Sequence, residues 1–193
     1  IGSFYKKKHV GTFGTFGVLS FNGNKTVTTG GGGMILTNNS KLGKLARLIS
    51  TTAKIPHLWR YRYSHRGFNY RMPNINAALG CAQLMSLNNF IKSKRKLYLR
   101  YKNFFKDIKE VSIMKEPKNT RSNYWLQTLI LNKENIILRN QILNFLKKKG
   151  IKVRPVWDLL DKNKPYLKCA KMDLSGAKKL EKKLINLPSS PSL

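Results

Sequence analysis

Four consecutive glycines, Gly30 to Gly33, interrupt an apolar, strand-forming sequence and constrain most strongly how the first part of this chain can fold. Short apolar runs at residues 18–21 and 34–37 flank the segment and predict two buried strands. Between them, an Asn-Gly pair and the glycine run predict turns, because glycine adopts positive φ without steric cost. The turn also carries one lysine, Lys25. The first half is therefore expected to be rich in strands and turns around this lysine.

Helical patterns follow this strand pair. Polar residues at 38–40 predict an N-cap for a helix that packs one apolar face, made by Leu42, Leu45, Ala46 and Ile49. Residues 51–74 form a long irregular segment with aromatic and basic side chains, a composition typical of functional loops. Apolar residues then recur at helical spacing from Ile75 to about Asp107, which predicts one long helix or two in sequence.

The second half predicts a small α/β or α+β unit. Residues 124–131 and 151–156 have the pattern of strands, and residues 136–149 and 174–187 have the pattern of helices. Gly150 follows a lysine-rich last turn and predicts the end of the first of these helices. We place the domain boundary near residue 95, which gives domains of residues 1–95 and 96–193.

The charge balance favours anionic partners. The chain has 38 Lys and Arg against 8 Asp and Glu, a formal charge of +30, which attracts polyanions, anionic membrane surfaces and phosphorylated ligands. One interpretation is a nucleic-acid-binding protein, in which the aromatic residues of 59–70 stack on bases. The alternative is that lysine covers solvated faces, because the lysines are spread along the chain.

Cysteine content and hydropathy bear on the setting of the protein. The two cysteines, Cys81 and Cys169, provide neither a disulfide framework nor the spacing of a metal site, and no metal is expected. No apolar run reaches the length of a membrane span, and no signal peptide opens the chain. These features favour a reducing, cytoplasmic setting without membrane attachment. The sequence begins at Ile1 without Met, so we expect the reading frame to start upstream.

Three interpretations of Lys25 compete. A nucleotide P-loop requires Gly, four residues and then Gly-Lys-Ser/Thr, whereas here Gly17 is followed by five residues and Gly23-Asn24-Lys25-Thr26, so both the spacing and the Gly-Lys adjacency fail. A lysine nucleophile fits better, because a partly desolvated amine forms Schiff bases. The remaining alternative is an ordinary surface charge on a hairpin.

Four motifs in their order and spacing carry a family resemblance. The segments SFNGNKTVTTGGGG, FNYRMPNINAALGCAQL, SNYWLQTLI and KVRPVW resemble the DegT/DnrJ/StrS family of sugar aminotransferases. The resemblance implies an α/β chain with part of the type I fold of enzymes that use pyridoxal phosphate (PLP), namely the back half of the large domain followed by the small C-terminal domain. Within the family it favours the branch that aminates UDP-linked 4-keto-6-deoxy amino sugars on the route to legionaminic acid or bacillosamine.

The resemblance also implies roles for individual residues. Lys25 matches the lysine that binds PLP covalently and then moves the proton. Ser20 matches the hydroxyl that holds the PLP phosphate, and Asn69 matches an asparagine that reaches the partner's phosphate across a homodimer interface. Arg154 and Trp157 lie where the family approaches the nucleotide sugar. Each has an alternative: Ser20 as a buried strand hydroxyl, Asn69 as the cap of the next helix, and Arg154 as part of a surface turn.

Three departures or choices qualify the resemblance. Relatives with histidine in place of the catalytic lysine act as dehydratases, so Lys25 retains the aminotransferase choice. Gly31 stands where many members carry Glu. PLP chemistry requires a carboxylate against the pyridine nitrogen, yet no Asp or Glu precedes Asp107. We therefore expect this carboxylate to come from a region upstream of Ile1.

Taken together, the resemblance predicts an aminotransferase that moves an amino group from glutamate to a keto carbon of a nucleotide-linked 4-keto-6-deoxy sugar, in surface polysaccharide or nonulosonic acid biosynthesis. It predicts PLP as cofactor, a homodimer with a shared active site, and no specific nucleic acid. We expect the chain by itself to be a fragment and inactive. The alternatives are the basic nucleic-acid-binding protein and a non-catalytic remnant of the family.

Overall fold

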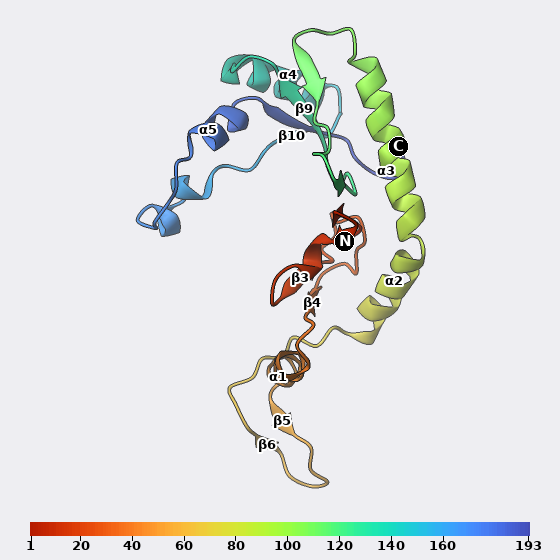
Figure 1. Cartoon of the computed structure of the whole chain (residues 1–193), viewed down its shortest axis with the longest axis vertical. Coiled ribbons are helices and arrows are strands. Elements are labelled where there is room, and N and C mark those ends of the chain that lie inside the picture. The colour runs from red at the N-terminus through yellow and green to blue at the C-terminus, as the bar shows by residue number, and fades with distance from the viewer. The chain divides into compact units, whose positions relative to one another are not determined.

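The computed structural model describes all residues from Ile1 to Leu193, and they divide into two compact units (Figure 1). The first unit comprises Ile1–Phe90 and Pro117–Asn123, and the second comprises Ile91–Glu116 and Tyr124–Leu193. Residue 95, where we predicted the domain boundary, lies within helix α3 (Leu87–Phe104), which contributes residues to both units. No helix in the chain has both the length and the apolar content that crossing a bilayer requires.

Short strands and helices alternate in the first unit. Its elements are β1 (Phe4–Tyr5), β2 (Lys8–His9), the 3-10 turn η1 (Val10–Thr12), β3 (Gly17–Ser20), β4 (Gly33–Leu36), α1 (Ser40–Ser50), β5 (Lys54–Ile55), β6 (Arg62–Tyr63), α2 (Asn74–Met85), the start of α3, and β8 (Thr120–Arg121). Strand β1 lies between β2 and β8 in an antiparallel sheet, which ties residues 117–123 to the N-terminal segment.

The strand pair around the glycine run is the centre of the first unit. Strands β3 and β4 pair antiparallel, with Gly17 opposite Leu36 and Ser20 opposite Gly33. The two predicted strands are thus confirmed to within one residue. The buried cluster below them consists of Leu19, Phe21 and Val27, against which Ile1, Leu36, Met72 and Leu87 pack.

The predicted helices of the first half are confirmed, but their packing differs from the expectation. The side chain of Asn39 caps α1 by accepting from the amides of Lys41 and Leu42 at 3.0 and 3.1 Å. None of the α1 residues is buried, and Gly43, Ala46, Arg47 and Ser50 of this helix border an open cavity. The long helical pattern resolves into α2 and α3, which are separated at Ser86.

A four-stranded antiparallel sheet forms the second unit. Its strands lie in the order β10 (Arg154–Pro155), β11 (Leu184–Leu187), β9 (Gln127–Leu131) and β7 (Val111–Ile113). The buried cluster Leu129, Ile185 and Leu187 receives side chains from α3 and from α4 (Ile136–Lys148). The remaining elements are two 3-10 turns, η2 (Leu160–Lys162) and η3 (Lys164–Tyr166), and α5 (Ser175–Glu181).

One predicted helix of the second half is wrong in its C-terminal part. The helix at 174–187 ends at Glu181, and residues 184–187 form β11, a central strand with all four residues buried. Pairing with β9 on one side and β10 on the other satisfies the backbone of this segment and overrides its helix-like apolar spacing. The two predicted strands are confirmed but shorter, as β9 and β10.

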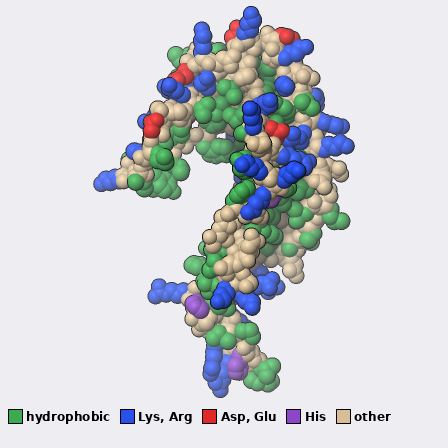
Figure 2. Space-filling model, in the orientation of Figure 1, with side chains coloured by type: hydrophobic (Ala, Val, Ile, Leu, Met, Phe, Trp, Pro, Cys, Tyr) green, Lys and Arg blue, Asp and Glu red, His purple; other side chains and the backbone are tan.

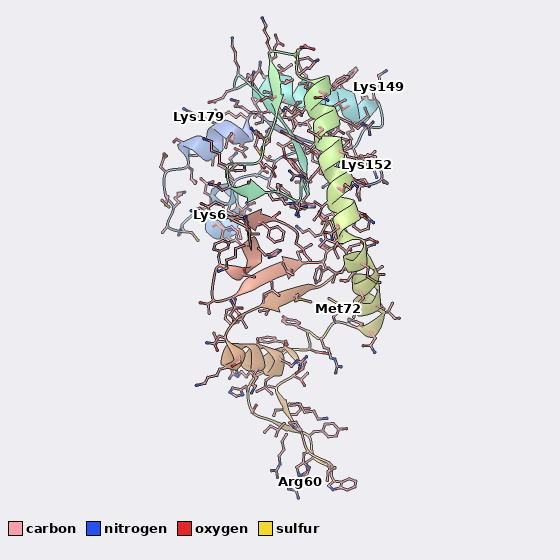
Figure 3. All side chains as sticks on the ribbon, turned by 45° about the vertical axis from the view of Figure 1, so that its right-hand side comes forward. Lys6, Arg60, Met72, Lys149, Lys152 and Lys179 are labelled. Carbon is pink, nitrogen blue, oxygen red and sulfur yellow. The ribbon has the colours of Figure 1, made fainter.

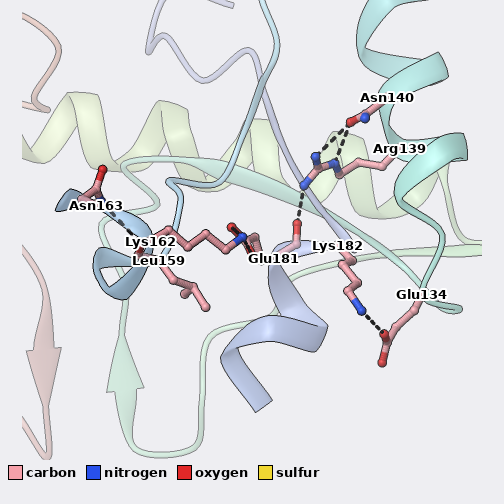
Figure 4. A network of polar contacts seen from close by, with 8 residues as sticks. All are labelled: Glu134, Arg139, Asn140, Leu159, Lys162, Asn163, Glu181 and Lys182. Carbon is pink, nitrogen blue, oxygen red and sulfur yellow. Dashed lines mark hydrogen bonds and ion pairs between the residues drawn. The ribbon is translucent and has the colours of Figure 1, made fainter. Parts of the chain in front are cut away.

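A polar network joins α4, η2 and α5 (Figure 4). Both carboxylate oxygens of Glu181 accept hydrogen bonds from Lys162 Nζ at 2.6 Å, and the backbone carbonyl of Glu181 accepts from Arg139. The hydrogen bond from Lys162 is the main cause that lowers the pKa of the Glu181 carboxyl. The network therefore holds α5 in place just before the chain enters β11.

Lys94 is the least exposed charged side chain of the second unit. Its ammonium donates to the carbonyl of Trp125 at 3.3 Å, to Ser189 Oγ at 3.2 Å, and to the carbonyl of Ser189. The side chain belongs to α3 and thereby fixes the segment before β9 and the segment after β11. Burial lowers the pKa of Lys94 to about 8.

This lowered pKa predicts a pH dependence of stability. The pKa of Lys94 is about 8 in the folded chain and about 10.4 in an unfolded one, so between these values only the unfolded chain keeps the proton. Stability should therefore rise with pH over this window, by about 1–2 kcal/mol after allowance for solvent screening. Urea unfolding of the natural chain and of Lys94→Met, from pH 7.5 to 10, measures the difference that isolates this lysine. Equal pH slopes in the two proteins would contradict the assignment.

Candidate functional site

Lys25 lies in a loop that folds back onto the end of β3. The amide of Phe21 donates to the carbonyl of Gly32, and the amide of Thr29 donates to the carbonyl of Phe21, both at 3.0 Å. A tight turn within the loop is closed by the Lys25 amide, which donates to the carbonyl of Asn22 at 3.0 Å. Phe21 and Val27 are buried on either side of this turn. The lysine is therefore half-buried on a backbone that its neighbours fix.

The glycine run closes the loop by a tight backbone approach. Gly30 and Gly32 have φ of +80° and +106°, which side chains other than glycine rarely adopt. A Cβ at Gly33 would lie 2.6 Å from the carbonyl oxygen of Leu19, so β4 could not pair with β3 at this point. At Gly31, by contrast, nothing lies within 4 Å of a Cβ. A Cβ at Gly31 would therefore meet no steric obstacle.

Helix α2 holds the loop from the other side. The side-chain amide of Asn76 donates to the carbonyl of Thr29 at 2.6 Å, across 47 positions in sequence. Gly80 of the same helix approaches so closely that a Cβ there would lie 2.8 Å from Thr29 Cγ2. Sequence reasoning placed Asn76 and Gly80 in a family motif and assigned them no role. Their contacts with the Lys25 loop have no signal in local spacing.

Ser20 and Asn69 are both exposed. Their surroundings test the two alternative roles considered above, a buried strand hydroxyl for Ser20 and a helix cap for Asn69. Ser20 ends β3 opposite Gly33, so the alternative of a buried strand hydroxyl is wrong. Asn69 forms an antiparallel bridge with Thr51, while the N-cap position of α2 is Pro73. Asn69 therefore does not cap that helix.

A cavity of about 1290 Å³ opens beside the glycine run. Its wall is partly apolar, and its charged residues are Arg47 and Arg71, with no carboxylate among them. Gly31 and Gly32 border it, whereas Lys25 and Ser20 are not part of its lining. Arg71, a residue of the FNYRMPNINAALGCAQL motif, thus adds positive charge to the cavity wall.

The predicted substrate residues Arg154 and Trp157 belong to the second unit. Arg154 lies in β10 opposite Asn186, and the exposed Trp157 follows that strand. The indole of Trp157 contacts that of Trp125, with ring centroids 5.9 Å apart. Trp125 had no predicted role. Its carbonyl accepts from Lys94 and from Ser189 Oγ, so the base of the tryptophan pair is anchored.

No carboxylate belongs to the unit that carries Lys25. All 8 acidic residues of the chain lie in the ranges of the second unit, from Asp107 to Glu181. Within the first unit, polar contacts to the Lys25 loop therefore come from amides, hydroxyls and backbone groups. A group that needs a negatively charged partner beside Lys25 cannot obtain one from this unit.

The whole chain matches one protein family. The profile of the DegT/DnrJ/EryC1/StrS aminotransferase family covers residues 1–193. The chain belongs to this family. The resemblance that the four sequence motifs indicated is thereby confirmed.

Two curated members of the family illustrate the match. EpsN of Bacillus subtilis (strain 168), described as a pyridoxal phosphate-dependent aminotransferase, is 40% identical over 157 residues, which cover 81% of this chain and 40% of EpsN. GDP-perosamine synthase of Escherichia coli O157:H7 is 38% identical over 193 residues, which cover 100% of this chain and 51% of the synthase. The chain thus spans about half the length of these relatives.

Structural likeness extends over both units. The solved structure of Helicobacter pylori PseC, an aminotransferase involved in the biosynthesis of pseudoaminic acid, matches with a TM-score of 0.92 at 25% identity. The match covers 99% of this chain and 52% of PseC. The prediction of an α/β chain that forms part of an aminotransferase fold is therefore confirmed.

The glycine run offers a matched pair of substitutions. Gly33→Ala should lower stability by about 1–3 kcal/mol, because the new Cβ would meet the Leu19 carbonyl. Gly31→Ala should change it by less than about 0.5 kcal/mol, because that position is open and its φ is not positive. Thermal unfolding of the two variants beside the natural chain tests this contrast. Equal effects would show that the close approach at Gly33 does not restrict the loop.

Proposed function

We propose that this protein is the lysine-bearing part of a PLP-dependent aminotransferase that transfers an amino group from glutamate to a keto carbon of a nucleotide-linked 4-keto-6-deoxy sugar. The observation that carries the proposal is Lys25, half-buried on a loop that β3, the glycine run and α2 hold in place. Membership of the aminotransferase family and the name of EpsN support the cofactor.

The residues present fit the aldehyde and phosphate ends of PLP. The Lys25 amine can bind the aldehyde, because a lysine amine forms Schiff bases with carbonyl groups and this one lies half-buried on a fixed loop. The exposed Ser20 hydroxyl at the end of β3 can donate to the phosphate. The ring nitrogen needs a carboxylate that the first unit does not contain. We propose that this carboxylate comes from polypeptide corresponding to the half of the relatives that this chain does not span.

When bound, PLP supplies the electron sink for bond changes at the carbon that carries the amine. The chain's own contribution is positional. Lys25 Nζ holds the cofactor and then moves a proton to or from that carbon, and the fixed loop backbone limits where Nζ can lie. Asn69 supplies a phosphate contact to a partner subunit in a homodimer, and its exposure on the first unit leaves it accessible for this contact.

The sugar nucleotide is the substrate class that we propose, with Arg154 and Trp157 as its contacts on the second unit. A guanidinium can donate hydrogen bonds to sugar hydroxyls, and an exposed indole suits the face of a sugar ring. The motifs favoured a UDP-linked substrate, whereas the 38% identical relative is named for a GDP-linked product, so both nucleotides belong in an assay. The cytoplasm, where nucleotide sugars are made, is the location that we propose.

Cofactor binding tests the proposal directly. The test uses the protein produced together with the polypeptide encoded upstream of Ile1. When PLP is added, this protein should acquire the visible absorbance of a lysine-bound PLP. Lys25→Ala should lose that band. Lys41→Ala, an exposed lysine of α1 in the same unit, should keep it. If the extended protein stays colourless with Lys25 intact, the proposal is wrong.

The same experiment separates an enzyme from a non-catalytic remnant. A remnant would bind no PLP or would bind it without turnover, whereas the enzyme should release 2-oxoglutarate from glutamate when given a 4-keto-6-deoxy sugar nucleotide. A coloured protein that produces no 2-oxoglutarate with either UDP- or GDP-linked sugar would favour the remnant.

A further inference from the structure

Residues 54–70 form an exposed arm of unusual composition, which we call the basic arm. Strands β5 and β6 make its stem, and it projects from α1 at the lower end of the view in Figure 1. Its tip carries Arg60 (Figure 3), and Trp59 and Tyr61 beside it are 84% and 77% exposed. The arm contains four Lys and Arg residues and no acid, and Figure 2 shows hydrophobic, Lys or Arg, and His side chains at this end but no Asp or Glu.

The base of the basic arm is held in one conformation. The amides of Thr52 and Phe68 donate to the carbonyls of Phe68 and Ile49 at 2.9 and 2.7 Å. A Cβ at Gly67 would lie 2.3 Å from the carbonyl carbon of Thr52, so the two chains of the arm touch there. Thr52 and Ala53 both adopt positive φ, a conformation that persists only when the surroundings impose it. The arm therefore leaves the first unit at a fixed place.

Rings and a cation share one side of the stem. Lys54 pairs directly with Tyr63 across the hairpin, and its Nζ lies 4.1 Å from the centroid of the Tyr61 ring. Tyr61 and Tyr63 are two residues apart, which in an extended chain places both rings on the same side, about 7 Å apart. At the tip, His57 Nδ1 accepts from the amides of Trp59 and Arg60 at 3.1 Å, which orders the turn.

This combination matches the chemistry of a nucleotide. A nucleobase stacks on exposed aromatic rings, and phosphates attract Lys and Arg where no carboxylate competes. We propose that the basic arm binds the nucleoside diphosphate part of the substrate, with the base on the aromatic side chains around Trp59 and Tyr61 and the phosphates on Lys54 and Arg60. This inference rests on the proposed function, because it assumes a nucleotide-linked substrate.

A single nucleotide suits the arm better than a nucleic-acid strand. Proteins that bind single strands use a groove that follows several nucleotides, with stacked rings along it. The stem of the arm has two paired residues in each strand; Trp59, Arg60 and Tyr61 lie together at its tip, and Lys54 Nζ lies 4.1 Å from the Tyr61 ring. That surface accommodates one base and its phosphates.

Nucleotide titration tests the inference on the chain itself. GDP or UDP should quench tryptophan emission with saturation, and Trp59→Phe should remove most of the quenching. Lys54→Ala combined with Arg60→Ala should weaken binding about tenfold through loss of two phosphate contacts. The matched control is Lys147→Ala with Lys148→Ala on α4, which removes equal charge from exposed positions of the other unit and should change the affinity less than about twofold. Circular dichroism checks that the variants fold.

Four outcomes would overturn the inference. If neither GDP nor UDP quenches the emission, the arm is not a nucleotide site. Quenching that persists in Trp59→Phe would assign the nucleotide to Trp125 and Trp157. If nucleotide affinity falls equally in the two double variants, the effect is due to net charge and not to the basic arm. Binding of a single strand of about ten nucleotides that is more than about 100-fold tighter would identify a nucleic-acid surface.

The nucleotide titration and the PLP experiment test the two proposals separately. If the protein acquires the Lys25-dependent absorbance but GDP and UDP do not quench Trp59, only the inference about the basic arm is wrong. If the protein remains colourless but GDP or UDP quenches the emission of Trp59, the proposed aminotransferase function is wrong and the basic arm is still a nucleotide site.

Discussion

The absence of carboxylates from the first unit is the constraint on which the candidate site depends. With no Asp or Glu in its ranges, this unit cannot fix Lys25 through an internal ion pair. Backbone hydrogen bonds, the close approach at Gly33 and the amide of Asn76 position the loop instead. Such contacts carry no net charge, so they leave the net positive charge of the unit unchanged. They also leave the unit strongly attractive to phosphates.

The second unit, in contrast to the first, contains acidic residues that form ion pairs. It contains all 8 acids, and several of them pair closely, as Arg95 does with Glu116 at 2.6 Å and Lys162 with Glu181 at 2.6 Å. The ammonium of its buried Lys94 donates to carbonyl and hydroxyl oxygens; burial carries a desolvation cost, but these bonds link α3 to the start of β9 and to the end of β11. The tryptophan pair at Trp125 is anchored by the same lysine.

Much of the fold follows from local pattern. The glycine run between two apolar segments predicted β3 and β4, and Asn39 predicted the start of α1, because turns and caps depend on residues next to one another. The error at residues 184–187 has a different origin. The segment's spacing also suits a helix, and only pairing with β9 and β10 makes it a strand. The second tryptophan of the indole pair likewise escaped local reasoning, since Trp125 and Trp157 meet only in the folded sheet.

The sequence by itself determined the order and spacing of the family motifs, the identity of Lys25 as the candidate amine, and the lack of any acid before Asp107. These are properties of residue type and position, which folding does not alter. Only the tertiary structure decided that Asn76 and Gly80 hold the Lys25 loop, that Ser20 is exposed, and that a fixed base presents the basic arm. Each of these depends on contacts between segments far apart in the chain, whose pairing is set by packing and backbone hydrogen bonding and has no signal in local sequence.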